Sequence, residues 1–260
     1  MNAPLAYTIL LQNLTIGYGS TRVVKHLQVS IPAACATAIL GFNGTGKSTL
    51  LRSIAGLQPL IGGDIVAQGR SIQSLSVQEL SRQIAVVLSG RGEMVQTLLV
   101  HEVLAMGRFP YRRFLQEPTE EDHAIVQRTG ERMQIMPLFN KRLYQLSDGE
   151  YQKVAIARAL IQDTPVLLMD EPTSHLDLHY KLEIFSLIRE LAAEGRTVIF
   201  TSHEIELSIR IAQFGLLIGQ EGIWTAGEMS ALVRQGAIRS WFERGNLHFD
   251  PERQRFDYTL

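Results

Sequence analysis

The segment GFNGTGKST, residues 41–49, matches the pattern GxxxxGK followed by Ser or Thr at every fixed position. Glycines let such a loop fold back so that successive backbone N–H groups point into one concavity that fits a phosphate group. A helix that follows adds the positive end of its dipole. Lys47 can then reach the β- and γ-phosphates, and the Ser48 hydroxyl can bind a magnesium ion that bridges them. The expected phosphate-contacting residues are Gly41, Asn43, Gly44, Thr45, Gly46, Lys47, Ser48 and Thr49.

The residues on either side of this loop support the same interpretation. Residues 36–40 are mostly apolar, which is typical of a buried strand. Leu50, Leu51 and Ile54 recur at helical spacing after the loop. A glycine-rich turn with a chance lysine would not require a strand before it and a helix after it. The sequence therefore predicts a phosphate-binding loop in an α/β fold.

Composition limits the remaining functional classes. The 260 residues include 25 basic and 26 acidic ones, so bulk charge gives no indication of nucleic-acid binding. The length fits one domain with an inserted or appended subdomain. The N-terminal residues show no basic segment before a long apolar core, and no apolar run is long enough to span a bilayer. We therefore expect a cytoplasmic chain, with no nucleic-acid partner, that does not itself cross a membrane. Its single cysteine, Cys35, lies in an apolar run and is expected to be buried.

Two acidic residues follow a second apolar strand. Residues 166–169, VLLM, lead directly into Asp170 and Glu171. A buried parallel strand delivers such residues to its carboxyl edge, where open α/β sheets bind ligands. Asp170 is the expected magnesium-binding acid. Glu171 is the expected general base, or the residue that positions the water attacking the γ-phosphate. The alternative, a strand that ends in surface acids, does not require the phosphate-binding loop upstream.

Three further features have two interpretations each. His203 follows the apolar strand 197–201, where it is either structural or in contact with phosphate. Tyr18 lies in a glycine turn, where its ring either rests on the surface or stacks on a base. Ser147 and Glu150 form a capping box for the helix that contains residues 154–161, and they serve a ligand only if that helix start faces a phosphate. The sequence alone leaves these alternatives open.

Taken together, these motifs resemble the ATP-binding cassette (ABC) ATPase family. The resemblance identifies a Walker A motif at 41–49, a signature at 146–150, a Walker B motif at 166–170 followed by Glu171, a D-loop at 174–177, and the switch residue His203. It implies a P-loop core formed by residues 1–89 and 161–226, with an N-terminal antiparallel β subdomain. It also implies an inserted helical subdomain at 90–160 and a C-terminal extension at 227–260.

The family resemblance also implies a partner and roles for further residues. Two cassettes face each other head to tail, so each ATP lies between the phosphate loop of one chain and the signature helix of a second copy. Tyr18 matches the aromatic residue that stacks on adenine. Ser147, Gly149 and Asp177 match nucleotide-contacting positions of the signature and D-loop, and the implied ligands are ATP and Mg²⁺.

Three positions depart from the family pattern. Ser89 stands where the family has the Q-loop glutamine, and its side chain is too short to reach the metal or water in the same way. Asp148 replaces a signature glycine and Glu150 replaces the usual glutamine. Acids at a helix start stabilise the helix by roughly 0.3–1 kcal/mol, but they oppose a bound phosphate. We therefore expect tuned, weaker closure on ATP.

The segment VLAMGRFPY, residues 103–111, resembles ATPases of iron–siderophore, haem and cobalamin importers. It implies two copies of this chain beneath two membrane permeases at the cytoplasmic face, supplied by an extracytoplasmic solute-binding protein. We expect residues 108–114 near the permease contact, although a basic and aromatic stretch is also typical of a solvated loop. The alternatives are a soluble ABC ATPase of a protein assembly, such as iron–sulfur cluster biogenesis, and a regulatory cassette without ATPase activity.

Overall fold

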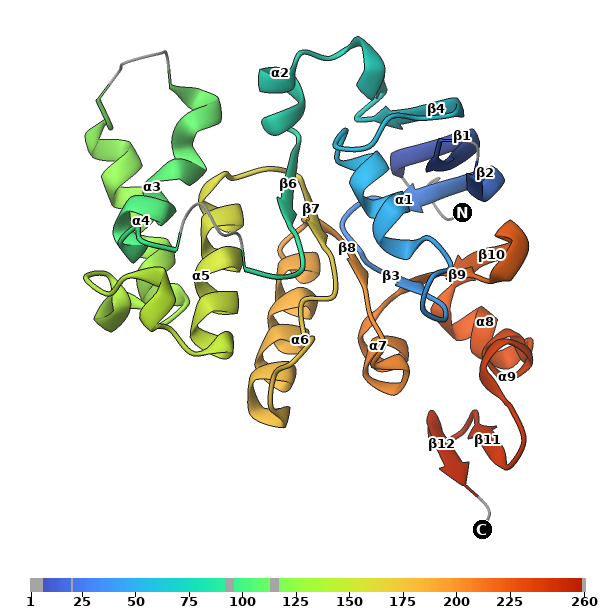
Figure 1. Ribbon diagram of the computed structural model, residues 1–260. Helices are drawn as coiled ribbons and strands as arrows, with labels where there is room; N and C mark the ends of the chain where they lie inside the picture. The colour runs from blue at the N-terminus through green and yellow to red at the C-terminus, as the bar shows by residue number, and fades with distance from the viewer. Residues whose placement is uncertain (1–6, 20, 92–95, 113–116, 259–260) are drawn as a thin grey trace, which may run out of the picture.

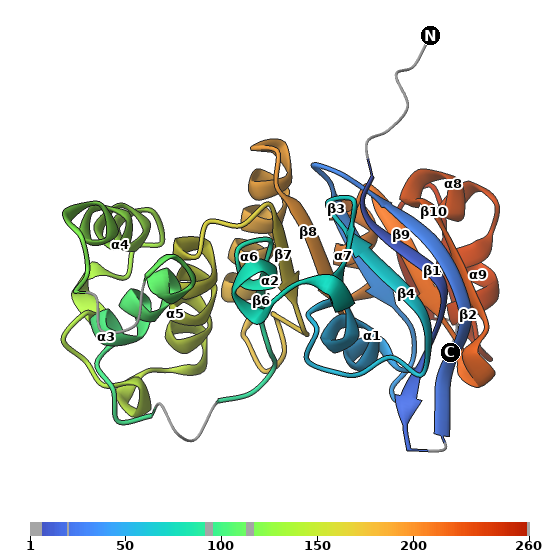
Figure 2. The ribbon, with the colours of Figure 1, turned by 90° about the horizontal axis from the view of Figure 1, so that it is seen from above.

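The structure, a computed structural model, describes residues 7–19, 21–91, 96–112 and 117–258. Its elements form a small antiparallel sheet, a larger parallel sheet and a block of helices to one side (Figure 1). Seen from above, the helical block lies beside the parallel sheet, at the end farthest from the antiparallel sheet (Figure 2). The P-loop core, the antiparallel β subdomain and the inserted helices predicted from the sequence are all present.

The larger sheet has six strands in the order β10-β9-β3-β8-β7-β6. All neighbours run parallel except β10, which pairs antiparallel with β9. The bounds are Ala36–Leu40 for β3, Ile84–Val87 for β6, Val166–Met169 for β7, Thr197–Thr201 for β8, Phe214–Ile218 for β9 and Trp224–Glu228 for β10. Because β3, β7 and β8 are parallel, the loops that follow them meet at one edge of the sheet.

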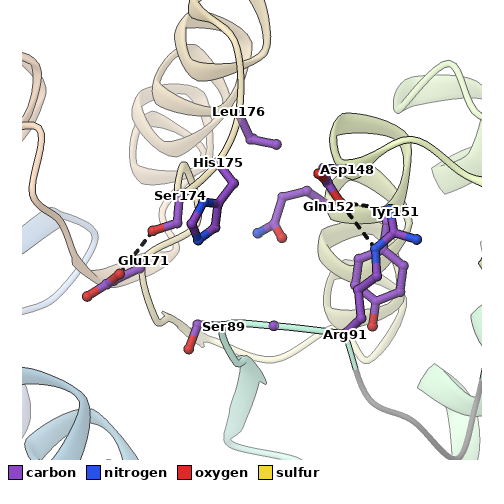
Figure 3. A pocket seen from close by; sticks show the side chains of 10 residues that line it. Ser89, Arg91, Asp148, Tyr151, Gln152, Glu171, Ser174, His175 and Leu176 are labelled. Atoms are coloured by element: carbon purple, nitrogen blue, oxygen red, sulfur yellow. Dashed lines mark hydrogen bonds and ion pairs between the residues drawn. The ribbon is translucent and has the colours of Figure 1, made fainter.

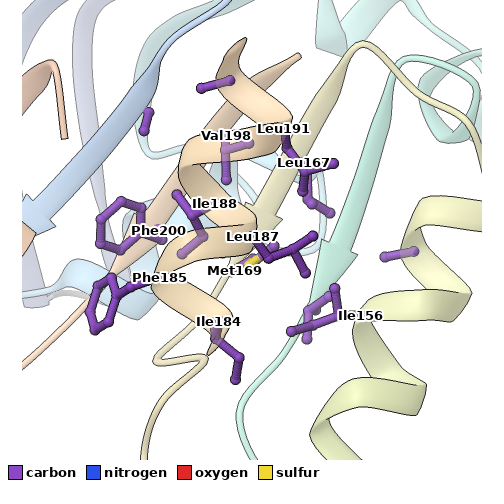
Figure 4. Close-up of a cluster of buried hydrophobic side chains, with 14 of the residues drawn as sticks. Ile156, Leu167, Met169, Ile184, Phe185, Leu187, Ile188, Leu191, Val198 and Phe200 are labelled. Carbon is purple, nitrogen blue, oxygen red and sulfur yellow. The ribbon is translucent and has the colours of Figure 1, made fainter. Parts of the chain in front are cut away.

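Apolar side chains cover both faces of this sheet, as buried parallel strands require. Leu167 and Met169 of β7 pack in the cluster of α6 (Leu178–Ala193), as Figure 4 shows. Leu168 points the other way, into the cluster of α1 (Lys47–Ile54). Alternate residues of one strand therefore reach opposite faces. Burial on both faces holds the strand, and the acids that follow it, in a fixed position.

The smaller sheet is antiparallel, in the order β2-β1-β4-β5. Its strands are Tyr7–Tyr18 (β1), Thr21–Pro32 (β2), Gly62–Ala67 (β4) and Arg70–Ser71 (β5). Its inward side chains join the cluster that includes α1, so this sheet covers the helix that follows the phosphate loop.

The helical block lies between β6 and β7 in the chain. It comprises α3 (Val100–Ala105), the 3-10 helix η3 (Met106–Tyr111), α4 (Glu120–Arg132), η4 (Met136–Leu138), η5 (Leu143–Gln145) and α5 (Asp148–Ile161). The predicted capping box is present at the start of α5. The Glu150 backbone N–H donates to Ser147 Oγ at 3.2 Å, and the Ser147 N–H donates to Glu150 Oε2 at 2.8 Å.

A buried ion pair holds this block together. Arg108 Nε donates to Asp122 Oδ1 at 2.8 Å, and the two side chains are only 11% and 9% exposed. Arg108 also donates to the carbonyl of Ile161 at 3.1 Å, which ties η3 to the end of α5. Burial by itself would raise the pKa of Asp122, but hydrogen bonds from Arg108 and Thr119 outweigh it and lower that pKa. The Arg108 side chain therefore lies in the interior of the helical block. Of the expected contact segment, residues 113 and 114 lie outside the described residues.

The remaining elements close the fold. They are η1 (Ile72–Ser74), α2 (Val77–Ser81), α7 (Ile205–Ile211), η6 (Gln220–Gly222), α8 (Met229–Arg234), α9 (Ala237–Phe242), β11 (Leu247–Asp250) and β12 (Arg255–Tyr258). β11 and β12 pair as an antiparallel hairpin, and Phe249 anchors it in the core cluster. No helix in the described ranges is both long enough and apolar enough to cross a membrane.

Candidate nucleotide site

The phosphate loop joins β3 to α1, as predicted. Gly44 and Gly46 have φ angles of 79° and 98°, a left-handed backbone that glycine adopts without strain. A Cβ on Gly46 would also lie 2.4 Å from a methyl group of Val23. Thr45 Oγ1 donates to the Phe42 carbonyl at 2.9 Å and closes the turn. The glycines are therefore needed for the shape of the loop itself.

Lys47 is the first residue of α1, and its side chain lies back along the loop. Its ammonium donates to the carbonyls of Gly41 at 2.9 Å and Phe42 at 3.0 Å, and the residue is 5% exposed. Burial lowers the pKa of Lys47, while the carboxylates of Glu171 and Asp170 act to raise it. The two acids that follow β7 therefore lie in the electrostatic field of this lysine.

Asp170 is 1% exposed and accepts hydrogen bonds from hydroxyl groups. Ser48 Oγ and Thr201 Oγ1 each donate to Asp170 Oδ1 at 2.8 Å. Ser89 Oγ lies 3.4 Å from Asp170 Oδ2, so this short side chain still reaches the acid. Mg²⁺ prefers oxygen ligands and usually leaves several positions to phosphates and water. The adjacent Ser48 hydroxyl and Asp170 carboxylate fit such an ion. No cluster of three or more His, Cys, Asp or Glu side chains suited to a metal occurs in the described part of the chain.

Glu171 has a defined orientation at the carboxyl edge of the sheet. His203 Nε2 lies 2.7 Å from its Oε1, and Ser174 Oγ donates to its Oε2 at 2.9 Å. Its backbone N–H donates to Thr201 Oγ1 at 2.8 Å. The Glu171 side chain is 26% exposed, so solvent can reach it. An oriented carboxylate that is open to water can accept a proton from a nucleophilic water molecule.

Tyr18 lies at the end of β1 and remains 51% exposed. Thr49 Oγ1 donates to its hydroxyl at 3.3 Å, which brings the ring beside the first turn of α1. Both sequence interpretations placed this ring on the surface, and the structure adds that it lies next to the phosphate loop.

The signature residues lie across a cleft from the catalytic edge. The cleft holds about 450 Å³ and separates the start of α5 from the segment after β7 (Figure 3). Its lining comprises Ser89, Gly90, Arg91, Asp148, Tyr151, Gln152, Glu171, Ser174, His175 and Leu176. In the described residues neither Ser147 nor Gly149 hydrogen-bonds to the phosphate loop of its own chain. A single chain therefore does not bring all the predicted site residues together.

Gly149 and Asp177 each have a structural role that the sequence did not reveal. A Cβ on Gly149 would lie 2.6 Å from the ring of Tyr180, so the close packing of α5 on α6 requires glycine there. Asp177 is the N-cap of α6, and its Oδ1 accepts the Tyr180 N–H at 3.0 Å. A nucleotide contact at either residue would be in addition to these roles.

Both acids of the altered signature have cationic partners. Arg91 Nη2 lies 2.8 Å from Asp148 Oδ1, and Lys141 Nζ lies 3.6 Å from Glu150 Oε1. The expectation that these acids oppose a bound phosphate therefore has to include the charges of Arg91 and Lys141.

Sequence reasoning also missed three site residues: Thr201, Ser174 and Arg91. The first two carry hydroxyl groups within predicted motifs or strands, yet nothing in their spacing indicates which carboxylate they contact.

Comparison with known proteins places this chain in a family. Residues 24–174 match the family model described as ABC transporter. The chain is 33% identical to the petrobactin import ATP-binding protein FpuD of Bacillus anthracis, over 89% of this chain and 85% of FpuD. It is 30% identical to the iron(3+)-hydroxamate import ATP-binding protein FhuC of Bacillus subtilis, over 89% of this chain and 86% of FhuC. The solved structure of CbiO1 from Clostridium perfringens, part of the ABC transporter complex CbiONQ, superposes with a TM-score of 0.76. That similarity covers 90% of this chain and 95% of CbiO1, at 27% identity.

Proposed function

The chain belongs to the ABC transporter family of ATP-hydrolysing subunits, and from this premise we propose that it drives an importer of an iron chelate, haem or cobalamin. The ATP-driven step of this proposal rests on one observation: Lys47, Asp170 and Glu171 lie together at one edge of the parallel sheet. Import proteins for petrobactin and iron(3+)-hydroxamate, each matched over 89% of this chain, support the solute class.

We assign the phosphates of ATP to the loop 41–49, with adenine stacked on Tyr18. Lys47 would move its ammonium from the loop carbonyls to the β- and γ-phosphates. Ser48 and Asp170 would hold Mg²⁺, which neutralises phosphate charge when bound. Glu171 would take a proton from the attacking water as the new bond to the γ-phosphorus forms and the bond to ADP breaks. His203 and Ser174 would keep the Glu171 carboxylate aimed at that water.

Two copies would complete each site. Ser147 and Gly149 flank Asp148, which lines the cleft together with Glu171, and this supports a model in which they serve the ATP held by a second copy. Asp177 would contribute at the same interface, because it follows the segment 174–176 that lines the cleft. In this model ATP draws the two chains together head to tail, and hydrolysis releases them.

We propose that each part of the chain has a separate task. Residues 1–89 and 161–226 would form the nucleotide-binding core. The helical subdomain 90–160 would transmit closure to a permease, and the extension 227–260 would brace the core. The protein would then act at the cytoplasmic face of a membrane, held there by the permease, with an extracytoplasmic protein delivering the solute.

Co-purification tests the importer proposal. The tagged chain would be isolated from gently solubilised membranes, and the associated proteins identified by mass spectrometry. We expect a polytopic permease in about equal amount. Lys47→Ala is the matched control: it alters the phosphate loop alone and should recover the same permease. Recovery of soluble assembly proteins without any permease would instead favour an ATPase of a protein assembly.

A further inference from the structure

The guanidinium of Arg91 holds the first turn of the signature helix. Its Nε and Nη2 lie 3.2 Å and 2.8 Å from Asp148 Oδ1. Nη2 also donates to the carbonyl of Leu146 at 2.8 Å. The guanidinium carbon lies 5.0 Å from the centre of the Tyr151 ring, within the range of a cation–π contact. Arg91 therefore contacts three residues of one helix start through charge, hydrogen bonds and ring packing.

The contact with Arg91 offsets the negative charge that Asp148 places at the start of the signature helix. Asp148 is the first residue of α5, and its side chain is 64% exposed. A carboxylate there opposes a phosphate that approaches the helix start. A guanidinium at 2.8 Å cancels that charge at short range. Glu150 is different, because the Ser147 capping box already uses its carboxylate.

The short segment Ser89-Gly90-Arg91 also crosses the cleft (Figure 3). At one end, Ser89 Oγ lies 3.4 Å from the Asp170 carboxylate. At the other end, Arg91 binds Asp148. Gly90 between them has a φ of 86°, which other residues adopt only with strain. Three consecutive residues thus connect the acid of the chain's own nucleotide site with the acid of its signature.

We propose that Arg91 is a positioning residue of the two-chain nucleotide site: it neutralises Asp148 so that the start of α5 can accept the phosphates held by a second copy of this chain. The inference rests on the proposed function, because it requires head-to-tail closure on ATP. When Arg91 leaves Asp148, the bare carboxylate repels the partner's nucleotide. Ser89, two residues before Arg91, lies 3.4 Å from the Asp170 carboxylate, so one short segment contacts both acids.

ATP-driven dimerisation measures this effect directly. Sedimentation would be followed with ATP and Mg²⁺ in a Glu171→Gln background, which slows hydrolysis. We expect Arg91→Ala to weaken the dimer by about 5- to 30-fold, or about 1–2 kcal/mol at 1.4 kcal/mol per tenfold change, because each dimer contains two such sites. ATP affinity of the monomer should not change, since the phosphate loop is intact. The loss should shrink at high salt, which screens exposed charge.

Paired variants separate charge from packing. Arg91→Ala combined with Asp148→Gly should restore dimerisation to within about threefold of the parent, because no bare carboxylate remains. Arg91→Lys should retain most of it, whereas Arg91→Gln should behave like Arg91→Ala. Lys141→Ala is the matched control for loss of a nearby cation, with a smaller effect expected, because its pair with Glu150 is longer, at 3.6 Å.

Three results would overturn the proposal. Arg91→Ala could dimerise as well as the parent, which would make the ion pair irrelevant to closure. The double variant could stay as weak as Arg91→Ala, which would assign the effect to the guanidinium itself and not to Asp148. Failure of the Glu171→Gln parent to dimerise with ATP would instead remove the proposed two-chain site, and this inference with it.

Discussion

Replacing Glu171 with glutamine tests the assignment of the catalytic base. The amide has nearly the same shape, and the partners of the carboxylate are His203 Nε2 at 2.7 Å and Ser174 Oγ at 2.9 Å. The serine hydroxyl can reverse its hydrogen bond and accept from the amide. The side chain should therefore keep its position while it loses the ability to take a proton. Nothing in the phosphate loop changes, so ATP binding should stay within about twofold of the parent.

The expected loss follows from the chemistry removed. A positioned general base contributes roughly 10²- to 10⁴-fold to the rate. That range corresponds to about 2.7–5.4 kcal/mol of activation free energy, at 1.36 kcal/mol per tenfold change. Ser174→Ala is the graded control, because it removes one orienting hydrogen bond and leaves the carboxylate. A hydrogen bond to a charged group is worth about 1.5–3 kcal/mol. If half of that free energy contributes to the transition state, its loss lowers the rate by roughly 4- to 13-fold.

Phosphate release with excess ATP and Mg²⁺ would give turnover, and equilibrium binding of a labelled nucleotide would give affinity. Turnover in Glu171→Gln within about threefold of the parent would refute the assignment. A loss in Ser174→Ala as large as that in Glu171→Gln would refute the narrower claim that Ser174 only orients the base.

Four further predictions concern binding and stability. Lys47→Ala should weaken ATP binding by roughly 10- to 100-fold, the worth of a charged hydrogen bond, and an unchanged calorimetric affinity would show that the lysine is dispensable. Arg108→Ala should lower the free energy of unfolding by about 3–5 kcal/mol in urea titrations, because it leaves a buried carboxylate unpaired, and a loss below about 1 kcal/mol would contradict this. The stabilisation by this pair should be present above about pH 4 and decline as the pH falls through the lowered pKa of Asp122; Asp122→Asn should remove that part of the acid dependence. Gly149→Ala should cost about 1–3 kcal/mol in thermal unfolding through its clash with Tyr180, and adding Tyr180→Ala should recover part of the cost unless the clash is absent.

Much of the site could be predicted because its parts are local. The phosphate loop requires glycine at left-handed positions such as Gly44 and Gly46, and the lysine follows at a fixed spacing. Asp170 and Glu171 follow directly after a buried strand, so the direction of that strand determines their edge. The capping box of Ser147 and Glu150 spans four residues of one helix start. In each case the chemistry and the backbone that positions it lie within one short segment.

The contacts that orient these groups could not be predicted, because they join distant parts of the chain. Thr201 meets Asp170 across 31 positions, and Arg91 meets Asp148 across 57. Two positions that depart from the family pattern have contacts of this kind. The Ser89 hydroxyl lies 3.4 Å from the Asp170 carboxylate. Asp148 has a guanidinium partner in Arg91.

The sequence by itself determined the class of chemistry here: a loop for phosphates, a metal-binding acid and a candidate base at the ends of parallel strands. Only the tertiary structure decided which hydroxyl orients which carboxylate, which glycine is required by packing, and which charge is neutralised. The physical reason is distance along the chain. Backbone conformation and helix capping depend on neighbouring residues, whereas the partner of a side chain such as Asp148 is known only once strands and helices have packed together.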